Sequence, residues 1–157
     1  MKKLLSYLFI IPVLLISGCS WVEYFTVGNK TDNPITVTYE LTKMEEGHIF
    51  GIFTNIPEAY QLSKSSKIQW EDKVELEDLD DNPAIVKVIL PPKTIMIFGR
   101  LHNDTYESNN QQFINSRDFN FGKMSIDQSE KTIQITKTTF DDYFVKKNGY
   151  VKFDVEE

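Results

Sequence analysis

The chain has 157 residues, of which 41% are hydrophobic and 25% are charged, and this composition is typical of a single globular domain. The formal net charge is -6 at pH 7, which is opposite in sign to that of a protein that binds nucleic acid by neutralising phosphates. One cysteine and two histidines are too few for a structural zinc site, a disulfide framework or an iron–sulfur cluster. We therefore expect no nucleic-acid partner and no bound cofactor.

Residues 1–19 have the pattern of a secretory signal peptide. Two lysines follow the first methionine, and a mainly apolar run extends from Leu4 to Ile16. This run is shorter than the ~20 residues that a membrane-spanning helix needs, and no second run of this kind follows in the sequence. We expect a signal peptide over residues 1–18 and a mature chain, residues 19–157, that forms one domain and does not cross a membrane.

The signal ends in Ile16-Ser17-Gly18-Cys19, which resembles the lipobox of bacterial lipoproteins: an aliphatic residue, two small residues and the cysteine that receives diacylglycerol. The resemblance covers only these residues, and it implies that Cys19 is the lipid-attachment site. Lipoproteins of this class carry two or three acyl chains, and each buried methylene contributes about 0.8 kcal/mol to membrane binding. The alternative is an ordinary secreted protein or an uncleaved N-terminal anchor, in which Cys19 stays a free thiol.

The residue after the cysteine bears on the membrane that would hold the anchor. In lipoproteins of this class an aspartate there favours retention in the inner membrane, and this chain has Ser20. No acidic run follows Cys19 directly, so the charged tether of some surface-exported lipoproteins is not evident. The resemblance thus implies a protein of the bacterial cell envelope, anchored in the outer membrane and facing the periplasm.

Most apolar residues of the mature chain alternate with period two or form short blocks, which is typical of β-strands. Residues 21–27 and 35–41 show this alternation, and the turn-forming residues 28–34 between them predict a β-hairpin. Residues 84–90 and 94–101 are apolar on both faces. We expect these two strands in the middle of the fold.

Other segments carry weaker signals. Residues 56–67 allow one or two helical turns, because Pro57 stands where a helix would begin, and residues 68–76 predict an irregular edge strand. The polar residues 102–112 predict a long exposed loop. Thr139 is expected to cap a single helical turn through its hydroxyl.

Seven to nine short strands at intervals of about ten residues favour an all-β fold. The first interpretation is an antiparallel β-sandwich of the Ig-like kind, and the alternative is a partly open β-barrel. The mature chain is long enough for a two-layer core without disulfide or metal cross-links.

Seven carboxylates lie within eleven consecutive positions, and we call these residues the acidic segment. They are Glu71, Asp72, Glu75, Glu77, Asp78, Asp80 and Asp81. The spacing of Asp78, Asp80 and Asn82 matches the first three ligands of a calcium loop. However, Pro83 and Ile89 stand where an EF-hand has glycine and a bidentate glutamate. We interpret the segment as a solvated edge and turn that also offers a docking surface for a cationic partner.

Softer ligands for a periplasmic copper site are Met44, His48, Met96, His102 and Met124. Met96 lies in a strand with the pattern of a core strand, and both histidines lie in polar turns. We therefore expect a buried methionine and solvated imidazoles rather than a metal site.

The sequence offers little for catalysis. His48 and His102 are the available imidazole bases, and the chain has neither a Gly-x-Ser-x-Gly elbow nor a glycine-rich phosphate loop. Two glutamates beside His48 are near enough in sequence to orient it. Trp70 and Tyr60 suit stacking on a sugar, although most aromatic rings are expected in the core. We expect a protein that is not an enzyme.

Together these features predict a lipid-anchored envelope protein that acts as a non-enzymatic binding or assembly module. One alternative is an immunity or inhibitor lipoprotein that docks a basic toxin or lytic enzyme through the acidic segment. The other is a periplasmic metal-binding protein.

The lipobox interpretation predicts that Cys19→Ala abolishes incorporation of labelled palmitate into the expressed protein, because the thioether can form only on that sulfur. Ser17→Ala, which keeps a small residue in the lipobox, is the matched control and should retain the label. Label that persists in the Cys19→Ala protein would contradict the anchor.

Overall fold

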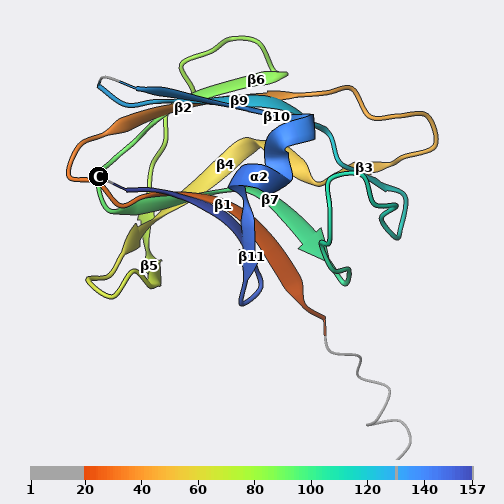
Figure 1. Ribbon diagram of the computed structural model, residues 1–157, viewed down its shortest axis with the longest axis horizontal. Coiled ribbons are helices and arrows are strands. Elements are labelled where there is room, and N and C mark those ends of the chain that lie inside the picture. Colours follow the sequence, from red (N-terminus) through yellow and green to blue (C-terminus); the bar gives the residue numbers. More distant parts are fainter. Residues whose placement is uncertain (1–19, 130, 157) are drawn as a thin grey trace, which may run out of the picture.

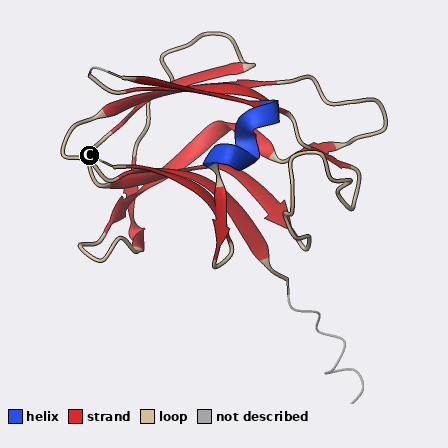
Figure 2. Cartoon of the chain, in the orientation of Figure 1, coloured by secondary structure: helices blue, strands red, loops and turns tan. Residues whose placement is uncertain are grey.

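The computed structural model describes residues 20–129 and 131–156, so the predicted signal peptide and Cys19 lie outside the described residues. The described chain forms two β-sheets packed face to face, with a short helix between them at one end (Figures 1 and 2). The predicted all-β sandwich is confirmed. Because the strands of the two sheets do not pair with each other, they do not close into a barrel.

The larger sheet has six strands and the smaller sheet has four. In spatial order the larger sheet contains β11 (Val145–Lys147), β12 (Tyr150–Val155), β1 (Val22–Asn29), β7 (Thr94–His102), β4 (Phe53–Leu62) and β5 (Ile68–Val74). The smaller sheet contains β10 (Thr132–Thr136), β9 (Phe121–Asp127), β2 (Ile35–Leu41) and β6 (Ile85–Leu90). A short pair joins β3 (Phe50–Gly51) to β8 (Arg117–Asp118), and a 3₁₀ turn η1 (Lys137–Thr139) precedes the helix α2 (Phe140–Tyr143).

The core between the sheets is rich in aromatic rings. Phe53 lies 4.9 Å from Phe25 and 4.9 Å from Phe119, both in edge-to-face geometry, which adds to the energy of apolar burial. Phe140 of α2 stacks on Phe144 with ring centroids 4.1 Å apart. The helix therefore contributes aromatic side chains to the core at one end of the sandwich.

The predicted hairpin of residues 21–27 and 35–41 is wrong, because β1 and β2 lie in different sheets. β1 pairs with β7 in antiparallel fashion and with β12 in parallel fashion, whereas β2 pairs with β6 and β9. The turn between β1 and β2 is a crossover from one sheet to the other. Turn-forming residues mark where a strand ends, but they do not say which strand lies beside it.

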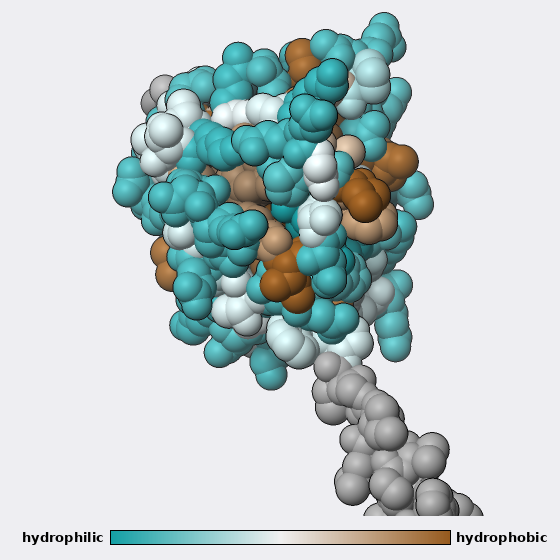
Figure 3. Space-filling view, turned by 90° about the vertical axis from the view of Figure 1, so that its right-hand side faces the viewer, coloured by the Kyte–Doolittle hydropathy of each residue, from teal (hydrophilic) through white to brown (hydrophobic). Residues whose placement is uncertain are grey.

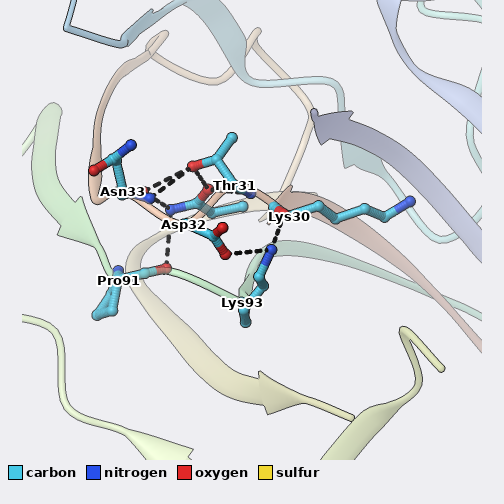
Figure 4. Close-up of polar contacts among 7 residues, drawn as sticks. Lys30, Thr31, Asp32, Asn33, Pro91 and Lys93 are labelled. Carbon is cyan, nitrogen blue, oxygen red and sulfur yellow. Dashed lines mark hydrogen bonds and ion pairs between the residues drawn. The ribbon is translucent and has the colours of Figure 1, made fainter. Parts of the chain in front are cut away.

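The buried side chain of Asn29 holds this crossover in place, and Figure 4 shows polar contacts among the residues of the crossover, with Thr31, Asn33 and Pro91 labelled. Its Nδ2 donates to the backbone oxygens of Asn33 at 2.9 Å, Leu90 at 3.0 Å and Pro91 at 3.0 Å. Its Oδ1 accepts from the amide and the hydroxyl of Thr31 at 3.1 and 2.8 Å. Since Leu90 and Pro91 begin the connection from β6 to β7, one amide group joins two crossovers. We call this end of the sandwich the crossover end.

Two further expectations about strands are corrected. Residues 56–67 are not helical but continue β4 and its turn, and Pro57 lies inside a register shift between β4 and β7, where proline's missing N–H is tolerated. β6 is an edge strand rather than a central one, and its Ile89 is 51% exposed. β7 is central, as predicted, and β5 is the predicted edge strand.

The predicted loop and cap also differ in detail. Tyr106, in the middle of the polar residues 102–112, is buried in the core, and its amide donates to Glu23 Oε2 at 2.8 Å. Thr139 makes no side-chain cap bond to α2. Instead its Oγ1 accepts from the Thr136 amide at 2.9 Å, at the start of η1.

Replacing Asn29 by alanine is expected to lower the free energy of unfolding by about 3 kcal/mol, because the buried Leu90 oxygen loses a donor, the Asn33 and Pro91 oxygens each lose one of two donors, and the Thr31 amide loses its acceptor. Urea denaturation of the two proteins measures the difference. Asn55→Ala, at an exposed strand position, is the control and should change stability by less than about 0.5 kcal/mol. Equal effects of the two substitutions would contradict the role given to Asn29.

Candidate functional site

A groove lies on the outer face of the larger sheet, on the side away from the smaller sheet. β5 and the hairpin of β11 and β12 both project from this side (Figure 1). Between them is a groove of about 550 Å³, with Trp70, Tyr150 and Ile95 among its lining residues. The turn Asn148-Gly149 has positive φ values of 53° and 80° at its two residues, as a tight hairpin turn requires, and Asn148 borders the groove. We call this feature the aromatic groove.

Four aromatic rings cross the sheet in one row. Tyr60 of β4 lies 5.2 Å from Trp70 of β5, Trp70 lies 5.5 Å from Tyr24 of β1, and Tyr24 lies 5.8 Å from Tyr150 of β12. β7 lies between β1 and β4, so the edge strand β5 brings its Trp70 side chain back over the sheet. Trp70 remains 47% exposed, which leaves part of its ring free for a ligand.

Trp70 and Tyr60 were predicted from the sequence as residues suited to stacking, and the structure brings these two rings together. Tyr24 and Tyr150 were not predicted, and the parallel pairing of β1 with β12 places them side by side. Each tyrosine alternates with a buried neighbour, Phe25 or Val151. That alternation was a usable signal that both tyrosines point outward, but their meeting depends on two strands more than a hundred residues apart in the chain.

An ionic network supports the rings at one side of the row. The Arg100 guanidinium lies 5.9 Å from the Tyr24 ring centroid, within reach of a cation–π interaction, and it pairs with Glu58. The Tyr60 hydroxyl donates to the same carboxylate at 3.2 Å. Although burial opposes ionisation, the charge of Arg100 holds the pKa of Glu58 below its usual value. Burial and the neighbouring Glu58 raise the pKa of Tyr60, so this phenol stays neutral.

A second network lies where the groove meets the crossover end. The Asp154 carboxylate bonds to Lys30 Nζ at 2.9 Å and to Lys152 Nζ at 2.5 Å. Although burial opposes ionisation, these two hydrogen bonds hold the pKa of Asp154 below its usual value. Lys67 and Lys147 also line the groove, and neither forms an ion pair with the described part of the chain. The groove therefore combines exposed aromatic faces with two free ammonium groups.

The acidic segment runs from the edge strand β5 of the larger sheet to the edge strand β6 of the smaller sheet. Glu71 and Asp72 are on β5, and the other five carboxylates are in the connection to β6. Within the described ranges none of the seven takes part in an ion pair. Charged side chains on an edge strand discourage pairing with another chain, so the segment has a structural reason as well as the docking role expected from the sequence.

The residues with calcium-loop spacing form a series of turns. Asp78 Oδ1 accepts from the Asp80 amide at 3.1 Å, Asp80 Oδ1 from the Asn82 amide at 2.9 Å, and Asn82 Oδ1 from the Ala84 amide at 3.0 Å. These are Asx turns, which account for the recurring Asp and Asn without a ligand. Over residues 20–129 and 131–156, no three His, Cys, Asp or Glu side chains are placed to hold a metal ion.

The softer metal-ligand candidates are dispersed. Met96 and Met124 are fully buried on strands of different sheets, and His48 and His102 line different hollows. Burial lowers the pKa of His102, as do the charges of Arg117 and Arg100. No carboxylate of the described chain bonds to either imidazole, so the structure assembles no nucleophile–base pair around them.

No protein-family model matches this chain, and neither a curated protein nor a solved structure matches it significantly. Among the residues described, no helix has both the length and the apolar character that crossing a membrane requires. The groove itself defines the candidate site: an open surface with stacked rings and ammonium groups.

The ionised Asp154 should make stability depend on pH. Its folded-state pKa lies below the unfolded value, so its contribution is complete above about pH 4 and is lost as the pH falls through the folded-state pKa. Asp154→Asn should therefore lower the free energy of unfolding by about 1 kcal/mol at pH 7, and the difference should shrink toward acid pH. Urea denaturation between neutral and acid pH measures this. Asp72→Asn, an exposed carboxylate on β5, should show no such trend.

Proposed function

We propose that this protein is a lipid-anchored, non-enzymatic binding module of the bacterial cell envelope, and that its ligand occupies the aromatic groove. The row of rings carries the proposal: Trp70 and Tyr150 line the groove, and Tyr60 and Tyr24 pack against them. These rings are partly exposed although they are large enough to fill a core. Their exposure on a sheet whose opposite face is fully packed favours a binding role.

A saccharide chain fits the chemistry of the groove. The flat apolar faces of sugar rings match exposed aromatic faces, and the hydroxyls of Ser65 and Ser66 with the amide of Asn148 can form hydrogen bonds with sugar hydroxyls. The free ammonium groups of Lys67 and Lys147 add a preference for carboxylates. The ligand we propose is therefore an acidic glycan, of the kind found in the cell wall.

The location follows from the lipobox. Acylation of Cys19 would hold the domain at the outer membrane, facing the periplasm, where it meets the cell wall. An acyl anchor also suits a domain with net negative charge, because anionic lipids would otherwise repel it.

The acidic segment supports a second candidate function, an inhibitor or immunity lipoprotein. Its carboxylates are unpaired within the described chain and lie together along one edge, which complements a basic enzyme. Asp78 Oδ1 accepts hydrogen bonds from the backbone amides of Asp80 and Lys87, so replacing Asp78 would also disturb the fold. Glu75 and Glu77 are exposed and free of such bonds, so they are the residues to neutralise.

The groove proposal predicts that the full-length protein in detergent sediments with purified peptidoglycan and that Trp70→Ala weakens this binding roughly tenfold, since the stacked ring and its buried area are lost. Trp21→Ala is a matched control, because Trp21 is 50% exposed but lies outside the groove, and it should bind like the unaltered protein. Absence of binding by the unaltered protein, or equal loss in both variants, would contradict the proposal.

The same proteins separate the two candidates. If the second candidate is correct, the double variant Glu75→Gln and Glu77→Gln loses binding to a cationic lysozyme while Trp70→Ala keeps it. If the groove is the functional site, the glutamine variant still sediments with peptidoglycan.

A further inference from the structure

The end of the sandwich where the chain enters β1 exposes several large apolar side chains. Ile49 is 66% exposed, Phe50 57%, Trp21 50% and Ile114 48%. Three of them are aliphatic or phenyl groups with no polar atom to offer to water. Figure 3 shows hydrophobic patches on this side of the molecule, surrounded by hydrophilic residues. We call these four residues the apolar rim.

Hydrogen bonds tie the segments of the apolar rim to one another. The Trp21 indole donates to the Asp104 backbone oxygen at 3.3 Å, and the Asp104 carboxylate accepts the Ile114 amide at 2.9 Å. The Ile49 amide donates to the Ser116 oxygen at 2.9 Å, two residues beyond Ile114. Three segments distant in sequence therefore meet at one end of the fold, and each contributes an exposed apolar side chain.

The position of the proposed lipid anchor indicates that a lipid bilayer would cover the apolar rim. Cys19 is two residues before Trp21, and two residues span at most about 7 Å. Trp21 is itself fixed to the domain, because its amide donates to Asn103 Oδ1 at 3.2 Å. An acyl chain on Cys19 would thus hold the apolar rim against the membrane surface with almost no linker.

We propose that the apolar rim is a membrane-contact surface that enters the interface of the bilayer holding the anchor. This inference rests on the proposed acylation of Cys19. Tryptophan, phenylalanine and isoleucine are the side chains that peripheral proteins bury at the headgroup boundary. Arg117 and His102 line a shallow hollow beside Phe50, and Arg117 forms no ion pair with the described chain, so its guanidinium is available to a lipid phosphate.

This contact also sets how far the parts of the aromatic groove lie from the membrane. β1 runs from the apolar rim at Val22 to the crossover end at Asn29, a distance of about 25 Å for eight extended residues. Several groove residues, including Lys30, Ile95 and Asp154, lie at the crossover end. With the rim in the bilayer, these residues form the part of the groove farthest from the membrane, and Tyr150, which pairs with Tyr24 near the start of β1, forms a part closer to it.

Tryptophan fluorescence tests the inference in the acylated full-length protein. Both native tryptophans are first replaced by phenylalanine, and a single reporter is then introduced by Phe50→Trp at the rim or by Ile89→Trp near the crossover end. In phosphatidylcholine vesicles with brominated acyl chains, emission from the Phe50→Trp reporter should fall about twofold, since interfacial side chains lie about 5–10 Å into the boundary. The Ile89→Trp reporter is equally exposed at the start and should keep its emission.

Flotation of the same vesicles measures whether the protein is anchored to the membrane, independently of whether the apolar rim contacts it. If the protein floats and both reporters keep their emission, the membrane contact is overturned while the proposed anchor stands. If the protein does not float, the anchor fails and the inference fails with it. Adding Ile49→Ser and Ile114→Ser to the Phe50→Trp protein should reduce the quenching without preventing flotation, and unchanged quenching there would count against a shared apolar rim.

Discussion

The arrangement of the two sheets depends on one buried amide. Asn29 donates to backbone oxygens of its own crossover and of the crossover from β6 to β7, so two connections that each change sheet are held at one corner. Buried carbonyls need such donors because water cannot reach them. The sequence pattern of β1 and β2 is that of an ordinary hairpin, but in the sandwich the two strands belong to different sheets. The Asn29 hydrogen bonds stabilise the turn that takes the chain from one sheet to the other.

The two proposed surfaces depend on the position of β1 in the larger sheet. β1 lies between β7 and β12. In this position its Tyr24 ring contacts both Tyr150 and Trp70, which completes the row of rings. The other end of β1 begins at the apolar rim, next to the predicted lipid-attachment residue. A single strand therefore relates the two proposed surfaces: its outward side chain Tyr24 belongs to the row of rings, and its first residue, Val22, lies beside the apolar rim.

Parts of the fold and of the candidate site could be predicted from single residues and their neighbours. Alternation identified β1 and β2, and Trp70 with Tyr60 were recognised as residues suited to stacking. Sequence patterns failed where one pattern is compatible with two structures. A proline such as Pro57 can begin a helix or lie in a strand irregularity, and an apolar strand such as β6 can lie in the middle of a sheet or at its edge. Which holds depends on neighbouring strands that are remote in sequence.

By itself, the sequence determined the all-β class and the approximate strand positions, because side-chain alternation is a local property of extended backbone. It also supplied the lipobox resemblance, which is a linear motif. Only the tertiary structure decided that β1 and β2 part, that Tyr24 meets Tyr150, and that Trp21, Ile49, Phe50 and Ile114 share one end. These are contacts between distant segments, and they are set by which buried polar groups find partners and which faces pack, rather than by the order of residues along a strand.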